Sequence, residues 1–251
     1  MKDMLPNTIE FFANELVVNQ EDLRPIPCKL NIPDWYKELE HTVQEKTIKG
    51  CMPFLDTLTT GYLLKIPIDV HIAHNVLKED HKASIWEAAD NHLPADSKEY
   101  INIDSKESNS SHPIRQLGEK CPFVKKNKNF PFRKILNPWI IKTPPGYSCL
   151  FLPPLNNSDD RFSIIPGIVD TDKYILEVNF PIVFNGDKYP ILETTIKKGT
   201  PYVQVIPFKR DAWKSKIKVK DKKEVRQERF NFMSTIFHNY KNAWWSKKSW
   251  K

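Results

Sequence analysis

Alternation of apolar and polar positions is the clearest pattern along the chain. Between residues 62 and 72 an apolar side chain occupies every second position, namely Leu64, Ile66, Ile68, Val70 and Ile72. A repeat of two residues is typical of a strand with one buried face. The pattern therefore predicts one half-buried strand over 62–72. Pro67 places it at a sheet edge or a bulge, because proline lacks the N–H that a ladder hydrogen bond needs.

Short strand-like runs also fill residues 135–208, separated by turn signals. The expected strands are 139–142, 149–152, 162–165, 174–184, 189–196 and 202–208. Asn185-Gly186 predicts a tight hairpin between two of them, because glycine tolerates the positive φ of such a turn. Short strands with a turn about every ten residues indicate a mainly β fold, either a sandwich or a barrel.

The periodicity changes near the C-terminus. Residues 220–245 carry an apolar stripe at spacings of three, four and seven, formed by Val225, Phe232, Met233, Ile236, Phe237, Tyr240 and Trp244. This spacing predicts a C-terminal amphipathic helix. Just before it, Lys214, Lys216, Lys218 and Lys220 alternate with Ser215, Ile217 and Val219, which suits a strand with one charged face.

These patterns divide the chain into three parts. Residues 1–50 form a lead-in that we expect to pack on the main body. Residues 51–210 form the β domain, with a polar insertion at about 78–134. Residues 211–251 form a basic, Trp-rich segment with the helix. The 20 prolines against 7 glycines argue against a bundle of long helices, since proline interrupts them.

Charge is distributed unevenly between these parts. Residues 209–251 hold 14 Lys and Arg against 4 Asp and Glu, a net charge of +10, whereas residues 1–208 hold 24 against 27, a net charge of −3. The formal charge of +7 therefore belongs to the C-terminal segment. The chain has no apolar stretch of about 18 residues for a membrane span and no apolar signal region at its start. Its four cysteines are scattered, so we expect free thiols and a cytoplasmic protein that is not secreted.

Three segments carry a resemblance to a known superfamily. They are Trp139–Pro153 with its Pro144-Pro145-Gly146-Tyr147 turn, Pro166–Tyr174, and Ile196–Phe208. Over about 135–210 the chain resembles the dUTPase and dCTP deaminase superfamily. The resemblance implies a distorted, jelly-roll-like β-barrel that assembles as a homotrimer. It also implies a catalytic carboxylate at Asp170 and nucleotide contacts at Tyr174 and Gln204.

Departures from the superfamily fall on the catalytic groups. The superfamily binds nucleotide phosphates with an Arg and a Ser, but Pro154 and Leu155 occupy those positions and neither side chain donates a hydrogen bond. Its dUTPases also close the site with a Gly-rich C-terminal arm, whereas the last glycine here is Gly199. We therefore expect a retained fold with a lost activity. No cofactor is expected, and Mg²⁺ only if the protein hydrolyses nucleotides.

Two groups of side chains suggest metal binding by their spacing. Asp69 and His71 share one face of the strand predicted over 62–72, and His74 follows that strand, although ordinary surface polarity explains them better. Four acids, Asp159, Asp160, Asp170 and Asp172, form a second group that suits Mg²⁺ beside a phosphate, with Arg161 nearby. Turn residues beside strands account for Asp159 and Asp160 equally well, so no metal site is predicted.

The C-terminal segment combines cations with aromatic residues. The candidate binding residues are Lys241, Trp244, Trp245, Lys247, Lys248 and Trp250. They suit docking on an acidic protein partner with tryptophan anchors, nucleic-acid binding, or a solvated tail. The favoured hypothesis is a non-catalytic, oligomeric interaction or structural module of viral or phage origin. The alternatives are a divergent nucleotide-binding enzyme that uses Asp170 and a nucleic-acid-binding accessory protein.

Overall fold

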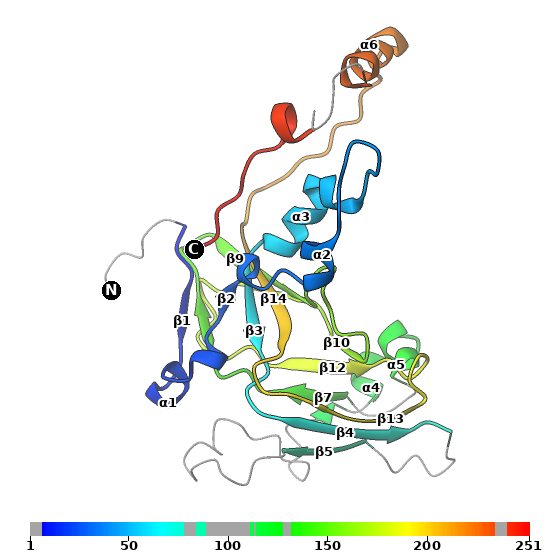
Figure 1. Cartoon of the computed structure of the whole chain (residues 1–251). Helices are drawn as coiled ribbons and strands as arrows, with labels where there is room; N and C mark the ends of the chain where they lie inside the picture. Colours follow the sequence, from blue (N-terminus) through cyan, green and yellow to red (C-terminus); the bar gives the residue numbers. More distant parts are fainter. Residues whose placement is uncertain (1–6, 78–83, 89–110, 113, 128–131, 234–239) are drawn as a thin grey trace.

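Short antiparallel strands make up most of the regular structure (Figure 1). The computed structural model describes residues 7–77, 84–88, 111–112, 114–127, 132–233 and 240–251. Its strands are β1 (Glu10–Phe12), β2 (Ile26–Pro27), β3 (Tyr62–Lys65), β4 (Val70–Asn75), β5 (Ser84–Ala88), β6 (Ser111–His112), β7 (Phe132–Ile135), β8 (Ile140–Lys142), β9 (Tyr147–Leu152), β10 (Phe162–Ile164), β11 (Gly167–Val169), β12 (Phe180–Phe184), β13 (Ile191–Ile196) and β14 (Pro201–Lys209). The α-helices are α1 (Glu15–Val18), α2 (Asp34–Glu38), α3 (Met52–Thr59), α4 (Ile114–Leu117), α5 (Pro122–Lys126) and α6 (Lys222–Met233).

The strands form four antiparallel sheets. The largest has the order β11-β9-β14-β3-β2, and the others are β10-β12-β7-β6, β13-β4-β5 and β1-β8. The mainly β class predicted from the alternating pattern is confirmed. Among the described strands no sheet closes on itself, so the structure does not confirm a barrel.

Residues 62–72 are buried on the predicted face but do not form one strand. Leu64, Ile66, Ile68, Val70 and Ile72 all belong to the main hydrophobic core. However, β3 pairs with β14 and β2, whereas β4 pairs with β13 and β5, so the two halves lie in different sheets. The single predicted strand is wrong because Pro67 cannot extend the ladder and the chain turns there from one sheet to the next.

The hairpin predicted at Asn185-Gly186 is also wrong. The strand before it, β12, pairs with β10 and β7, while the strand after it, β13, pairs with β4. The turn therefore connects two sheets, and Gly186 does not adopt a positive φ. Strand β12 also begins at Phe180, whereas Tyr174, Ile175 and Leu176 of the predicted 174–184 strand are exposed.

The N-terminal lead-in packs on the sheets as expected. Its strand β1 pairs with β8 and β2 pairs with β3. Leu23 is buried, and its carbonyl accepts the Trp139 indole N–H at 3.2 Å. Part of the predicted polar insertion also joins the core, since Val124 and Phe132 pack with Val183 in a second buried cluster. Most of the insertion, including residues 89–110, lies outside the described residues.

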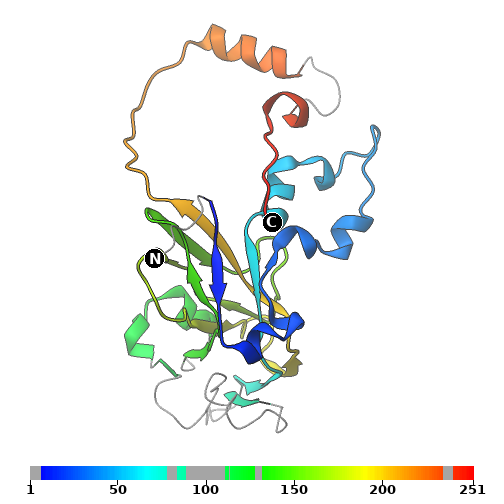
Figure 2. The same cartoon turned by 90° about the vertical axis from the view of Figure 1, so that its left-hand side faces the viewer.

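The C-terminal part of the chain leaves the sheets after β14. Figures 1 and 2 show α6 standing away from the body and the chain then returning toward α3. The single amphipathic helix predicted over 220–245 is not confirmed. The described residues of this range form α6 and a π-helical turn at Tyr240–Trp244, and Ile236 and Phe237 lie outside the described residues. The strand predicted around Lys214–Lys220 does not form, and Ile217 and Val219 are fully exposed. Among the described helices, none is long and apolar enough to cross a membrane.

Candidate functional site

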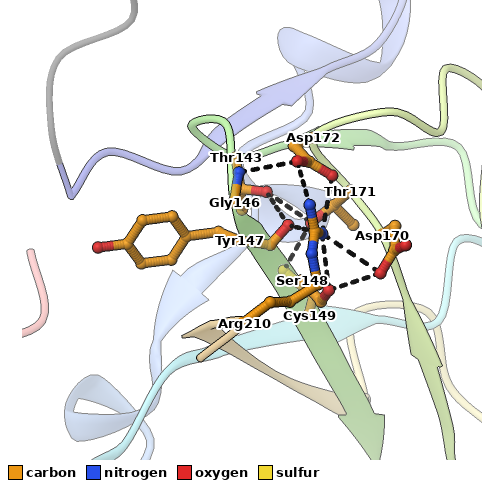
Figure 3. A network of polar contacts seen from close by, with 9 residues as sticks. All are labelled: Thr143, Gly146, Tyr147, Ser148, Cys149, Asp170, Thr171, Asp172 and Arg210. Atoms are coloured by element: carbon orange, nitrogen blue, oxygen red, sulfur yellow. Dashed lines mark hydrogen bonds and ion pairs between the residues drawn. The ribbon is translucent and has the colours of Figure 1, made fainter. Parts of the chain in front are cut away.

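The three segments that carry the superfamily resemblance meet in the largest sheet, where β11, β9 and β14 lie side by side. The Pro144–Tyr147 turn leads into β9. In this turn Gly146 has a φ of +84° and the Tyr147 N–H donates to the Pro144 carbonyl at 3.2 Å, as in a type II turn. Asp170 follows β11 and Arg210 follows β14, so both reach the same end of the sheet (Figure 3).

Arg210 is the centre of a polar network at this end. Its Nη1 donates to the Tyr147 carbonyl at 2.7 Å and to the Ser148 hydroxyl at 2.9 Å. Its guanidinium also pairs with Asp172 through two hydrogen bonds, one of them at 2.9 Å to Oδ1. Asp172 is almost fully buried and accepts the Gly146 N–H at 2.9 Å. The hydrogen bond from Arg210 is the main reason why the pKa of Asp172 is lowered to about 2.

Asp170, the predicted catalytic residue, lies at the edge of this network. Its Oδ1 accepts the Ser148 hydroxyl at 2.7 Å and lies 3.3 Å from Nη1 of Arg210. Its side chain is 53% exposed, so solvent reaches it. The Asp170 carbonyl accepts the N–H groups of Lys173 and Tyr174, which fixes the turn after β11. Asp170 is thus part of a network of hydrogen bonds and ion pairs within the chain.

Beneath the charged groups lies a small buried layer of hydroxyls and a thiol. Thr143 and Thr171 share a hydrogen bond at 2.7 Å between their hydroxyls, and the Thr171 hydroxyl donates to Sγ of Cys149 at 3.3 Å. Burial raises the pKa of the Cys149 thiol to about 11, so it stays protonated near neutral pH and is a poor nucleophile. All four cysteines are free thiols, as predicted.

The predicted nucleotide contacts are not brought together. Gln204 is buried, and its Oε1 accepts the Leu155 N–H at 2.7 Å. Its Nε2 donates to the carbonyls of Thr57 and Thr60, at 3.1 and 2.6 Å, so the amide faces the end of α3. Tyr174 instead is exposed in the turn after Asp170. Gln204 therefore stabilises the contact between the largest sheet and α3.

The four acids considered for Mg²⁺ separate into two places. Asp159 pairs with Arg161 at 2.6 Å and Asp160 pairs with Lys188, whereas Asp170 and Asp172 contact Arg210. The single acidic cluster expected from the sequence is therefore wrong, because each pair of acids has its own cations. Among the residues that the structure describes, no three His, Cys, Asp or Glu side chains are grouped as metal ligands.

The other suggested metal group is held by ordinary polar contacts. Asp69 accepts Nζ of Lys197 and the backbone N–H of Lys198, both at 2.7 Å, and the Lys197 hydrogen bond is the largest cause of its lowered pKa. His71 lies 3.3 Å from the Thr195 hydroxyl and 3.9 Å from Glu193. The His74 side chain lies outside the described residues.

The candidate binding residues of the C-terminal segment fall into two groups. Trp245, Lys248 and Trp250 contact the body, whereas Lys241, Trp244 and Lys247 are exposed. The Trp245 indole N–H donates to both oxygens of Asp56, at 3.2 and 3.0 Å, and Lys248 donates to Asp56 at 2.6 Å. We refer to residues 245–251 as the terminal segment.

Tyr62 completes the surface that receives the terminal segment. Its ring meets that of Trp250 edge to face at a centroid distance of 6.0 Å, and its hydroxyl donates to the Lys251 carbonyl at 3.0 Å. A cavity of about 460 Å³ lies beside these contacts. Its walls are the Pro144–Tyr147 turn on one side and the terminal segment on another, with Asn7, Thr8, Ile9, Tyr62, Thr143 and Pro207 between them.

Sequence reasoning missed Arg210, Asp56 and Tyr62. The available signal for Arg210 was its place directly after the closing strand, because the antiparallel partner of that strand begins at the Pro144–Tyr147 turn. No comparable local signal marks Asp56, which is 189 residues from Trp245. Comparison with models of protein families and with curated proteins found no match for the chain. Membership of the dUTPase-like superfamily therefore stays a prediction.

Proposed function

We propose that the protein is a non-catalytic module on a dUTPase-like β fold that assembles with copies of itself or attaches to a protein partner through its C-terminal segment. One observation carries the proposal. Between β14 and the terminal segment, large apolar side chains extend into solvent, with Trp213 89%, Ile217 99% and Val219 101% exposed. We call residues 211–233 the arm.

Exposed apolar side chains of this size suit a surface that a partner covers. Phe230 and Phe232 on α6 are exposed as well. Tryptophan and phenylalanine beside cations are frequent anchors in protein interfaces. The charge of the C-terminal residues 209–251, +10, is opposite in sign to the −3 of residues 1–208, which favours attachment to an acidic surface such as that of another copy.

The network around Arg210 supports a non-catalytic role. Phosphoryl chemistry depends on donors that are positioned around the phosphates. Here the Arg210 guanidinium is paired with Asp172 and the Ser148 hydroxyl donates to Asp170. The Leu155 N–H, at a position where the superfamily binds phosphate, donates to Gln204 instead. These donors are committed to contacts within the chain.

The arrangement of the three resembling segments supports the dUTPase-like part of the proposal. They are separated along the chain, yet β9, β11 and β14 are neighbours in one sheet, and the acids after β11 reach the turn before β9. A homotrimer is the assembly that the resemblance suggests.

A nucleotide-turnover assay tests the non-catalytic part. We expect no pyrophosphate release from dUTP or dCTP with Mg²⁺ above that of an Asp170→Asn variant. Release that this substitution abolishes would contradict the proposal. It would favour the enzyme hypothesis instead.

Sedimentation velocity tests the assembly part. We expect the sedimentation coefficient of the full chain to rise with concentration, and a Trp213→Ser/Ile217→Ser/Val219→Ser variant to remain monomeric. The matched control is Leu30→Ser/Val43→Ser, which removes two exposed apolar side chains of the body. If the control and the arm variant behave alike, the arm is not the attachment surface.

Nucleic-acid binding is a second candidate, favoured by the eight Lys and Arg against four Asp and Glu in the arm, with exposed aromatic rings among them. It predicts binding of a single-stranded oligonucleotide whose affinity falls steeply as salt rises. Oligonucleotide binding that requires the arm, in a chain that stays monomeric, would favour this candidate over protein attachment.

A further inference from the structure

The terminal segment docks on the body through a few contacts with two neighbouring elements. Asp56 on α3 accepts the Trp245 indole and Lys248, and Tyr62 at the start of β3 contacts Trp250 and Lys251. We call Asp56 and Tyr62 the docking site. Both residues belong to the body, so every copy of the protein carries the complete docking site.

Contacts made by the arm do not dictate whether the terminal segment docks on its own molecule or on another one. Within the described structure, the hydrogen bonds and ion pairs of residues 212–230 join residues of the arm to one another, for example Lys220 to Glu228 at 2.6 Å. Figure 2 shows the arm running out from β14 to α6, which stands away from the body. Between β14 and α6 the side chains of Trp213, Ile217 and Val219 are exposed, so in this part of the arm the covalent connection, and not packing on the body, keeps the terminal segment at its own docking site.

The root of the arm, by contrast, is fixed. The Arg210 N–H donates to the Gly146 carbonyl at 2.8 Å, and its guanidinium is held by Tyr147 and Asp172. Because Arg210 is fixed and the first part of the arm is exposed, the terminal segment can reach a neighbouring molecule without a change in the body. Docking within one copy is favoured only by the covalent connection, which acts as an effective local concentration of the terminal segment. This advantage is limited for a long loop, so docking on a second copy competes when the protein concentration is raised.

We infer that the terminal segment of one copy docks on Asp56 and Tyr62 of a second copy, an exchange that rests on the proposed self-assembly. Such exchange makes the same contacts between copies as within one, and it is a low-cost route to oligomers. It also brings exposed arms of different copies together, where Trp213, Ile217 and Val219 can be buried. The cavity beside the Pro144–Tyr147 turn then lies between copies, because Trp250 and Lys251 come from the neighbour.

Complementary charge reversal tests the exchange. Asp56→Lys places two cations at the docking contact within one copy, and Lys248→Asp places two acids there. When the two variants are mixed, exchange pairs Asp56 with Lys248 at one contact and the introduced lysine with the introduced aspartate at the other. With one variant ¹⁵N-labelled, we expect native mass spectrometry to show mixed oligomers at about tenfold excess over either homo-oligomer, which corresponds to about 1.4 kcal/mol.

The control is the double variant Asp56→Lys/Lys248→Asp, which restores opposite charges within each copy. We expect it to fold and to associate like the unmodified protein. If each single variant forms as much homo-oligomer as the unmodified protein does, the exchange is overturned, because another surface then holds the copies together. The proposed assembly would stand in that case. Monomers in every sample, including the unmodified protein, would overturn both.

Discussion

Strand β14 and the first part of the arm, residues 213–220, both carry large apolar side chains of the kind found in strands, but their surroundings are opposite. In β14 the side chains of Tyr202, Val203 and Val205 are buried, and the strand is paired with β9 on one edge and β3 on the other. In the arm the alternating side chains are exposed and no described strand lies beside them. Apolar side chains of this size therefore call for a surface that covers them. In β14 the body covers them, and in the arm we propose that a partner does.

The largest effect is expected at the boundary between the two regions. Arg210→Met leaves the Asp172 side chain, which is 6% exposed, without its cation. Because the arginine itself is 29% exposed, we expect a loss somewhat below the roughly 3 kcal/mol of a fully buried pair. We expect this loss in the free energy of unfolding in urea. Lys209→Met, one residue earlier at an exposed ion pair with Asp211, is the control and should change stability by less than about 0.5 kcal/mol. Equal effects of the two substitutions would show that Arg210 does not anchor the arm.

One substitution made in both regions sharpens the comparison. Val205→Ala removes buried methyl groups from β14 and should cost about 2 kcal/mol. Val219→Ala in the arm removes the same groups from solvent and should change the stability of the monomer by less than about 0.5 kcal/mol. Both values follow from urea unfolding at low protein concentration. A large cost for Val219→Ala would mean that the arm packs on its own body.

Acid should weaken the ion pair between Arg210 and Asp172, and the resulting loss of stability should be smaller than that from Val205→Ala. The pKa of Asp172 is lowered in the folded protein to about 2, so its stabilising contribution is present above about pH 4 and is lost as the pH falls toward 2. The difference in stability between the unmodified protein and Asp172→Asn should therefore be largest near pH 6 and fall to a small fraction of that value near pH 2. Asp34→Asn, which removes an exposed ion pair with Lys37, should show little difference at either pH. A difference for Asp172→Asn that persists at pH 2 would contradict the ion-pair account.

The smallest effect concerns a buried hydroxyl in β14. In the described structure the Tyr202 hydroxyl is buried without a hydrogen-bond partner. Tyr202→Phe removes this unsatisfied group and should stabilise the protein by about 1 kcal/mol. The midpoint of thermal unfolding should rise accordingly. A fall in the midpoint would show that the hydroxyl has a partner, and Tyr174→Phe, at an exposed tyrosine, serves as the control.

The sequence predicted the features of the fold that depend on neighbouring residues. Strand-like runs bounded by turn signals located β9, β10, β13 and β14 within two residues, and alternation identified the buried face of residues 62–72. It failed at Pro67 and Asn185-Gly186, because which sheet a strand joins depends on partners far along the chain.

The candidate site was only partly accessible from the sequence for the same reason. Asp170 was found through the resemblance, but its neighbour Arg210 is 40 residues further on and comes beside it only when β14 pairs with β9. Asp56 and Tyr62 were missed because their contacts with the terminal segment follow from no local pattern. The strand predicted around Lys214–Lys220 does not form, because an alternating pattern does not show whether the surface that covers it belongs to the same chain.

Amide hydrogen exchange of the full chain at low and high protein concentration tests the central claim most directly. The account predicts that residues 201–209 are protected at both concentrations, because β14 is paired on both edges. Residues 211–221 should exchange freely in the dilute protein and become protected at high concentration, where a second copy covers them. Protection of residues 211–221 in the dilute monomer, or free exchange at both concentrations, would contradict the account.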